Sequence, residues 1–257
     1  MIKENLKYSD SNIFEGMPSI SAVIRSIECT LSDRRIITIY IDKSKLKSKA
    51  KEISFLQRKS ELLGFNIVFT ESENIDALVV GSTHGGIIAE CTPRTFPSLT
   101  NDLIIQNGVY YLLDGIEDPY NFGNAIRSIY ASGADGLIIG ERNWLSAAGT
   151  VARSSAGTSE LLPTYVCDIQ KAIDTFKSKG YKVACAGIRD SVSLFEADLS
   201  KPLLLILGGE KRGISRAVLD KCDEIIRIDY GTAFNGSLSA SASAAVFAFE
   251  IMRYNKK

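Results

Sequence analysis

Histidine is almost absent from this 257-residue chain, in which His84 is the only one. Zinc sites built on several histidines are therefore excluded, and a serine or cysteine triad would have a single possible base. The five cysteines are scattered and include no C-x-x-C pair. This spacing does not suit a metal site and is typical of reduced, mostly buried thiols. Hydrolase and metalloenzyme functions are disfavoured, and we expect no metal.

The chain also lacks a charge excess and a long apolar run. Lys plus Arg and Asp plus Glu each number 30, so no global basic field attracts nucleic acid. Any RNA contact must come from a local patch or from recognition of shape. The first twelve residues contain no apolar signal-peptide core, and no segment approaches membrane-spanning length. We therefore expect a soluble, cytoplasmic protein without a membrane partner.

The first part of the chain has the pattern of a small α/β unit. Apolar spacing and β-branched runs predict helices over Ile20–Leu31, Leu46–Leu63 and Ile75–Val80, and strands over Ile36–Ile41, Asn66–Thr70 and Gly86–Cys91. Gly64 ends the long second helix. The polar stretch Pro93–Gln106 marks a boundary. We expect a small α/β domain over residues 1–97, a linker over 98–107 and a second domain over 108–257.

The second domain alternates strands and helices, which predicts a mainly parallel, doubly wound sheet. Strands are expected over Tyr110–Gly115, Gly136–Ile139, Leu162–Val166, Tyr181–Ala186, Leu203–Leu207 and Glu224–Ile228, and helices over Phe122–Ser132, Ala148–Ser155, Asp168–Lys179, a segment after Gly213, and Leu238–Tyr254. Asn121 is expected to cap the first of these helices, Asp168 to cap the third and Gly180 to end it.

The stretch from Pro202 to Glu250 contains the best candidate site. A buried strand ends at Gly208-Gly209-Glu210, a second strand ends at Ile228, and a serine-rich loop leads into the last helix. Ligands bind at the carboxyl ends of parallel strands. The loop is neither a dinucleotide fingerprint nor a P-loop, because Glu210 stands at the second glycine position and no Gly-Lys-Ser/Thr follows. Taken alone, it is also typical of a tight turn.

Three motifs in order resemble a known family. They read Asn121-x-Gly123-x-x-x-Arg127, Gly208-x-Glu210-x-x-Gly213 and Ser237-Leu238-Ser239-x-Ser241-x-Ser243. Together they resemble the SpoU/TrmH class of SPOUT RNA ribose methyltransferases. The resemblance implies a parallel α/β sheet with a deep trefoil knot, S-adenosylmethionine as cofactor, a homodimer, and methyl transfer to a ribose 2′-OH of rRNA or tRNA.

The resemblance also implies roles for individual residues. The expected catalytic residues are Asn121, Arg127, Glu210, Ser237 and Ser239, and the expected cofactor-binding residues are Leu207, Gly208, Gly209, Gly213, Ile228 and Leu238. Arg127 would stabilise the growing 2′-oxyanion, since a guanidinium is not deprotonated in proteins. Asn121 would orient Arg127 or the acceptor. Without the resemblance, Asn121 would be a helix cap and Arg127 a solvated side chain.

Two departures from the family pattern leave an alternative open. Ser239 stands in the place of a family asparagine, and Asp229 in the place of a usual proline. A non-catalytic RNA-binding module that kept the knot is therefore the alternative to an enzyme. A nicotinamide oxidoreductase ranks third. The segment from Thr83 to Ile87 resembles the Thr-His-Gln-Gly-Val element of a substrate-binding domain found before SpoU methyltransferases. This resemblance implies that residues 1–97 form an RNA-binding-like domain, and His84 is expected either to contact RNA or to fix a turn.

Overall fold

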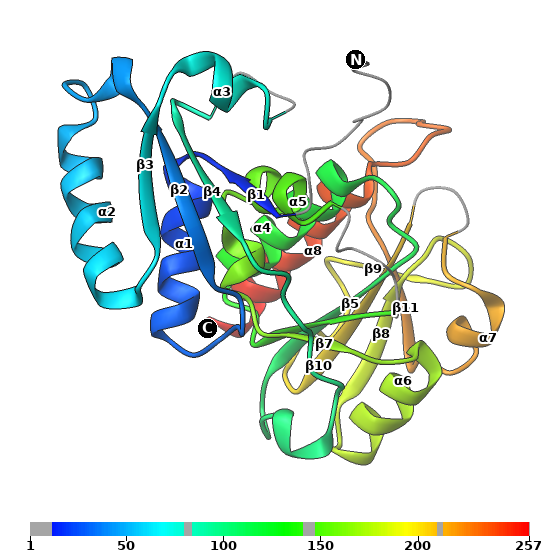
Figure 1. The fold of residues 1–257 in the computed structure, drawn as a ribbon. Coiled ribbons are helices and arrows are strands. Elements are labelled where there is room, and N and C mark those ends of the chain that lie inside the picture. The colour runs from blue at the N-terminus through cyan, green and yellow to red at the C-terminus, as the bar shows by residue number, and fades with distance from the viewer. Residues whose placement is uncertain (1–11, 80–83, 141–146, 210–212, 257) are drawn as a thin grey trace. The chain divides into compact units, whose positions relative to one another are not determined.

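The protein is described by a computed structural model that covers residues 12–79, 84–140, 147–209 and 213–256. The chain divides into two compact units (Figure 1). Unit 1 comprises residues 1–95 and 143–161, and unit 2 comprises residues 96–142 and 162–257. No helix in the described ranges is long and apolar enough to cross a membrane.

Unit 1 is built on a four-stranded sheet in the order β1-β4-β2-β3, in which β2 and β3 are parallel and the other pairs antiparallel. Its strands are β1 (Ile13–Glu15), β2 (Ile36–Asp42), β3 (Asn66–Thr70) and β4 (Ile87–Cys91). Its helices are α1 (Gly16–Glu28), η1 (Lys43–Lys45), α2 (Ala50–Leu63), α3 (Ser72–Asp76), α5 (Ala148–Ser154) and η4 (Thr158–Glu160).

The apolar patterns of unit 1 explain its core. Ile39 and Ile41 are fully buried and alternate along β2, and they pack with Ile24 of α1 and Leu56 of α2. Gly64 ends α2 with a φ of 75°, the left-handed conformation expected from the sequence. The strand β1 was not predicted, because three residues are too few to show a period.

The segment carrying α5 and η4 belongs to unit 1, although the sequence pattern placed it in the second domain. Ala152 is fully buried in the core formed by α1 and the sheet. The Glu160 carboxylate accepts a 3.0 Å hydrogen bond from Nε of Arg34, and both side chains are buried. Arg153 donates a 2.9 Å hydrogen bond to Glu15 of β1. Local sequence patterns could not reveal these contacts between distant segments.

Unit 2 contains a seven-stranded sheet in the order β7-β6-β5-β10-β8-β11-β9, and every pair in it is parallel. Its strands are β5 (Val109–Asp114), β6 (Gly136–Ile139), β7 (Thr164–Val166), β8 (Lys182–Ala186), β9 (Val192–Ser193), β10 (Leu203–Gly208) and β11 (Glu224–Arg227). Its helices are η2 (Asn101–Leu103), α4 (Pro119–Ala131), α6 (Ile169–Ser178), α7 (Arg216–Leu219) and α8 (Ala240–Asn255). The predicted parallel α/β sheet is confirmed, whereas the knot stays a prediction.

The strand β10 lies at the centre of unit 2, between β5 and β8. Five of its leucine and isoleucine side chains are buried, as its continuous apolar run predicts for a strand covered on both faces. On one face, Leu204 and Ile206 join a core that includes an aromatic cluster. Its rings lie 5.0 to 5.8 Å apart, between centroids, and belong to Tyr110, Phe176 and Tyr181.

Candidate functional site

The carboxyl end of β10 comes very close to the backbone that follows β5. A Cβ atom added to Gly209 would lie 1.9 Å from the carbonyl oxygen of Gly115, so no other residue fits there without a backbone shift. After the loop that contains Glu210, Gly213 donates its N–H to the carbonyl of Gly209 at 3.0 Å. The expected role of Glu210 falls outside the described residues.

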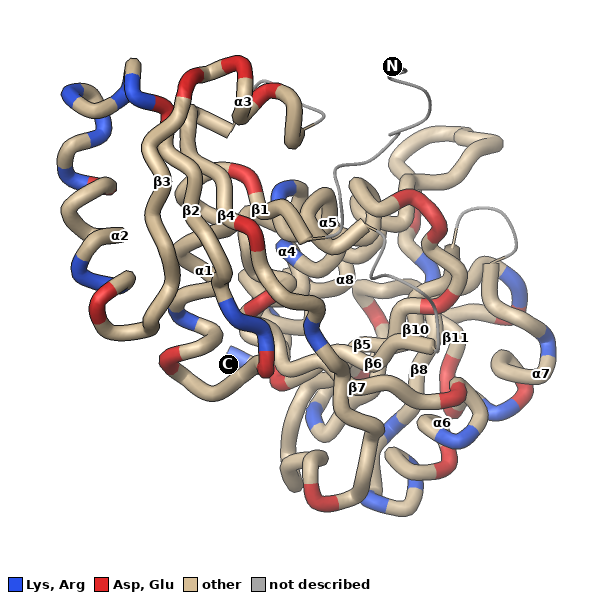
Figure 2. The backbone as a smooth tube through the Cα atoms, viewed as in Figure 1, with Lys and Arg blue, Asp and Glu red and all other residues tan. Residues whose placement is uncertain are grey.

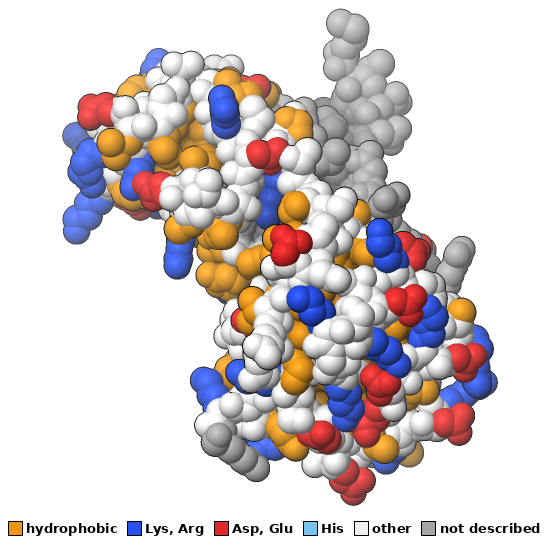
Figure 3. All heavy atoms as spheres, turned by 90° about the horizontal axis from the view of Figure 1, so that it is seen from below, with side chains coloured by type: hydrophobic (Ala, Val, Ile, Leu, Met, Phe, Trp, Pro, Cys, Tyr) orange, Lys and Arg blue, Asp and Glu red, His pale blue; other side chains and the backbone are white. Residues whose placement is uncertain are grey.

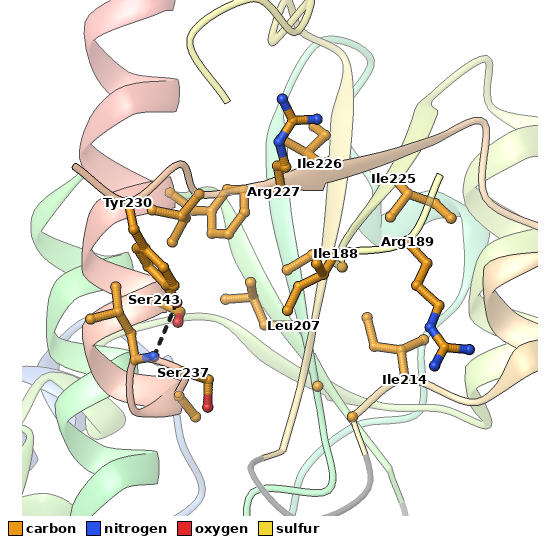
Figure 4. Close-up of a pocket in the computed structure, with 18 of the residues that line it drawn as sticks. Ile188, Arg189, Leu207, Ile214, Ile225, Ile226, Arg227, Tyr230, Ser237 and Ser243 are labelled. Carbon is orange, nitrogen blue, oxygen red and sulfur yellow. Dashed lines mark hydrogen bonds between the residues drawn. The ribbon is translucent and has the colours of Figure 1, made fainter. Parts of the chain in front are cut away.

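This end of the sheet opens into a pocket of about 610 Å³ within unit 2. Its walls are the segments that follow β8, β10 and β11, together with the start of α8. Figure 4 shows the apolar side chains of Ile188, Leu207 and Ile214 towards the middle of the view and the guanidinium groups of Arg189 and Arg227 at its border. Such a cavity, apolar with a few polar groups, is typical of a small-molecule site.

All six residues expected to bind cofactor line this pocket. They are Leu207, Gly208, Gly209, Gly213, Ile228 and Leu238. Three separate segments of the chain supply them, because β10 and β11 end at the same edge of the sheet and α8 begins there. Their role in binding cofactor stays a prediction.

Two of the three predicted motifs meet through a chain of hydrogen bonds. The Ser241 hydroxyl donates to Oδ1 of Asn121 at 3.1 Å, and the Ser239 hydroxyl lies 3.0 Å from that of Ser241. Ser239 also caps α8 by accepting the N–H of Ala242 at 3.2 Å. Since the hydroxyl of Ser241 donates to Asn121, that of Ser239 is the donor to Ser241. Ser237, the other serine predicted to be catalytic, lines the pocket.

The predicted capping role of Asn121 is wrong. The N-cap of α4 is Asp118, whose carboxylate accepts the N–H of Tyr120 at 2.8 Å, and Pro119 follows at the first helical position. Asn121 therefore lies inside the first turn, and its amide is available for the contact with α8. Arg127 lies two turns along α4 and is exposed, without an ion pair to any described carboxylate.

The comparisons with known proteins agree with this geometry. Residues 108–249 match the SpoU rRNA Methylase family. A Staphylococcus haemolyticus protein, named as a TrmH-family tRNA/rRNA methyltransferase, is 30% identical over 234 residues that cover 88% of this chain and 91% of the relative. The Bacillus subtilis relative YacO is 28% identical, with 88% and 92% covered.

The chain belongs to the SpoU rRNA methylase family. It is thus one of the RNA methyltransferases, and the family recognised from the three motifs is confirmed. Solved structures share the fold: an RNA 2′-O ribose methyltransferase superposes with a TM-score of 0.77 at 20% identity and covers 94% of this chain and 88% of its own. An AdoMet-bound rRNA methyltransferase from Sinorhizobium meliloti gives 0.75 at 21% identity, with 94% and 87% covered.

In this SpoU-family chain the pocket also contains residues that the sequence reading missed. The Tyr230 hydroxyl accepts the N–H of Leu238 at 3.3 Å (dashed in Figure 4) and so ties the start of the serine-rich loop to its end. Phe234 packs against Tyr230 with ring centroids 5.3 Å apart. The segment from Gly187 to Arg189 follows β8. Its position after a strand was the one signal that could have revealed it.

Asp229, which departs from the family proline, is held by charge and hydrogen bonds. The Ser193 hydroxyl and the Arg227 guanidinium lower the pKa of its carboxyl, and Nε of Arg227 lies 2.8 Å from Oδ1. Asp229 is therefore ionised at neutral pH and serves to fix Arg227 at the pocket border. Among the described residues, no group of three or more His, Cys, Asp or Glu side chains is placed to hold a metal ion.

Proposed function

We propose that this SpoU-family chain is an S-adenosylmethionine-dependent methyltransferase that modifies a ribose 2′-OH of rRNA or tRNA. The observation that carries the proposal is the pocket of about 610 Å³ at the carboxyl ends of β8, β10 and β11, lined by every residue expected to bind the cofactor. The cofactor is supported by family membership and by neighbours of the same fold that bind AdoMet.

The residues that line the pocket would hold S-adenosylmethionine, which would supply the methyl group and retain the electron pair of its broken carbon–sulfur bond. The ribose 2′-oxygen would form the new bond to carbon, and its proton would pass to solvent. The protein must hold donor and acceptor in line and favour the negative charge that grows on the oxygen. Arg127 suits this role because it is exposed, permanently charged and able to bind an adjacent phosphate.

The pair of Asn121 and Ser241 gives the first motif a fixed position relative to α8. We propose that Asn121 orients Arg127 or the acceptor ribose, and that Ser237 contacts bound cofactor or RNA from the pocket wall. Ser239 acts through Ser241 and as the cap of α8. Ser239 therefore has a structural role at the position where the family usually has asparagine. Glu210, expected from the family resemblance to be catalytic, is proposed to fix its loop by accepting backbone N–H groups.

We further propose that the chain contains a knot, forms a homodimer, binds RNA through its N-terminal domain and is located in the cytoplasm. The dimer is supported by apolar side chains that α4 and α8, which pack on each other, leave exposed. These are Tyr120, Val246 and Phe249, exposed by 46%, 37% and 45%. We expect light scattering to give twice the chain mass of 28.0 kDa, and a monomer at micromolar concentration would contradict the dimer.

The deciding experiment maps ribose methylation in RNA from cells with and without the gene, and then repeats the transfer in vitro with the unmethylated RNA. One site lost on deletion and restored by the purified protein with S-adenosylmethionine supports the proposal. Calorimetric binding of S-adenosylmethionine with no site lost would favour the non-catalytic module. Methylation of a base instead of the ribose would contradict the 2′-O assignment.

A further inference from the structure

A run of lysines follows β2 at one end of the sheet of unit 1, beside the acidic residues Glu71 and Glu73 at the start of α3 (Figure 2). Residues 43–51 contain lysine at five alternate positions and no acidic residue. They form η1, the turn that follows it and the start of α2, where Figure 2 shows closely spaced blue segments. On the face of unit 2 drawn in Figure 3, basic and acidic side chains are interspersed. The basic density is therefore local, in a chain whose charges balance overall.

Three of these lysines form no ion pair within 4.0 Å with a carboxylate of the described residues. Lys43 pairs with Glu71 at 2.8 Å and Lys49 with Glu52 at 3.0 Å. The remaining ammonium groups, those of Lys45, Lys47 and Lys51, belong to exposed side chains. Helix stability does not explain them, since cations near the start of a helix are unfavourable. Lys45 and Lys51 interact at longer range with the carboxylates of Asp42 and Glu52. All three side chains are exposed and can therefore also meet an external polyanion.

The backbone beneath the lysines is firmly held. The buried carboxylate of Asp42 accepts hydrogen bonds from the N–H of Ser44 at 2.8 Å and the hydroxyl of Ser72 at 2.7 Å. The N–H of Asp42 donates to the carbonyl of Gly86 at 2.8 Å. A Cβ atom on Gly86 would lie 2.7 Å from Cγ of Lys45, so the stem of Lys45 crosses this glycine. The lysine run and the turn after His84 thus share one edge of the sheet.

His84 orders that turn. Its Nδ1 accepts the N–H of Gly86 at 3.1 Å, so Nε2 faces the Asp76 carboxylate, also at 3.1 Å. The side chain is buried, with 9% exposed, and does not present its ring to a ligand. Of the two roles expected for His84, the structure supports fixing a turn. The turn can therefore present its backbone polar groups to a ligand, and Lys45 can present its positive charge.

An exposed aromatic ring accompanies the charges. Phe69 is 37% exposed near the end of β3 and pairs in register with Ile41, one residue before Asp42. Leu46, within the lysine run, is 44% exposed. Lysines and an exposed aromatic side chain at the same end of a sheet suit RNA, because ammonium groups bind phosphates and a ring stacks on an unpaired base.

We propose that Lys45, Lys47 and Lys51 bind the phosphate backbone of the substrate RNA beside the turn at Gly85 and Gly86. The inference rests on the proposed function and assigns the substrate contact of unit 1 to one edge of its sheet. Each lysine that neutralises a phosphate releases counterions, so these contacts contribute affinity that falls as salt rises.

The test compares two triple variants that lose the same charge. Lys45→Gln, Lys47→Gln and Lys51→Gln are combined in one, and Lys171→Gln, Lys179→Gln and Lys256→Gln, which lie in unit 2, in the control. The probes are two fluorescein-labelled, unmodified transcripts, one of tRNA and one of rRNA, each titrated between about 50 and 200 mM KCl. We expect the first variant to bind about tenfold more weakly, with a salt slope smaller by about 2 to 3. The control should stay within about twofold of wild type by the same reasoning.

The outcomes separate this proposal from the proposed function. Wild-type methyl transfer to RNA from deleted cells tests the enzyme, whereas the two variants test the surface. If both triple variants bind the transcripts alike, or if wild type binds neither of them, the lysine surface is overturned even in an active enzyme. If only the first variant loses affinity, the surface stands even when wild type transfers no methyl group.

Discussion

Among single residues, Arg127 allows a role in the chemical step to be distinguished from a role in binding. Its guanidinium is exposed on α4 and is proposed to act on the 2′-oxyanion, so it matters more in the transition state than in the bound complex. We expect Arg127→Ala to lower the single-turnover methylation rate by about 100-fold, by analogy with the loss of one oxyanion donor. Calorimetry should show little change in S-adenosylmethionine affinity.

Arg216 provides the control, because its guanidinium is also exposed in unit 2 but pairs with Asp220 one turn away. Arg216→Ala should keep the wild-type rate. An unchanged rate in the Arg127 variant would remove this residue from the site and would favour the non-catalytic module.

The contribution of the Asp42 carboxylate to the stability of unit 1 should depend on pH. The hydroxyl of Ser72, followed by hydrogen bonds from Ser44, lowers the pKa of its carboxyl below the ordinary value of 3.8. A depressed folded-state pKa gives stability that is complete above the ordinary value and is lost as pH falls through the folded one. We expect Asp42→Asn to cost about 2 kcal/mol at pH 7, as hydrogen bonds to a charged group do.

Urea unfolding of both proteins at neutral and strongly acidic pH measures this difference. The difference in free energy of unfolding between wild type and variant should be constant from neutral pH to just above the ordinary pKa of 3.8 and should decrease below it. A gap that widens in acid would show that the carboxylate does not hold η1 and α3 together.

At the scale of elements, Gly209 tests how tightly the end of β10 fits against the end of β5. A methyl group there would lie 1.9 Å from a backbone oxygen, which cannot move aside as a flexible side chain can. We expect Gly209→Ala to destabilise unit 2 by about 3 kcal/mol, the upper range for overpacking, and to weaken S-adenosylmethionine binding measured by calorimetry.

Gly140→Ala is the matched control, since a Cβ added directly after β6 meets no atom of the described residues within 4 Å. Equal stability and equal cofactor affinity in the two variants would mean that the loop after β10 can shift without harm. The pocket would then not depend on the close approach of the two strand ends.

The same elements show what the sequence can and cannot predict. Buried apolar runs located β5, β6 and β10, and Asp168 and Gly180 marked the ends of α6, because these signals depend on neighbours in the chain. The start of α4 was placed too late, although Asp118 followed by Pro119 is a strong start signal. The pocket residues after β8 lack a motif, and only the order of strands in the sheet brings them beside β10 and β11.

At the scale of the whole molecule, the two units do not follow the order of the chain. Residues 143–161 lie between β6 and β7 in the sequence, yet they complete the core of unit 1. Gly157 fits against α1 with no room for a side chain, since an added Cβ would lie 2.5 Å from that of Ala22. A domain boundary placed near residue 97 therefore separates residues 143–161 from the unit to which they belong.

This arrangement predicts that a fragment of residues 1–97 does not fold alone. Without Glu160, the Arg34 side chain, 2% exposed, loses its carboxylate, and without Arg153, Glu15 remains as an unpaired buried acid. Breaking one such buried pair costs about 3 to 5 kcal/mol, which is comparable to the stability of a small domain. Circular dichroism on heating should show no cooperative transition for this fragment.

Joining residues 143–161 to that fragment through a glycine-serine linker should restore a cooperative transition, because both ion pairs and the Ala152 contact return. A second joined fragment that carries Glu160→Ala serves as the control and should melt at a lower temperature, with the loss assigned to Arg34. If the fragment of residues 1–97 instead unfolds cooperatively by itself, and at the same temperature as the joined form, then α5 and η4 only contact a domain that folds without them. Their buried ion pairs would then contribute nothing to its stability.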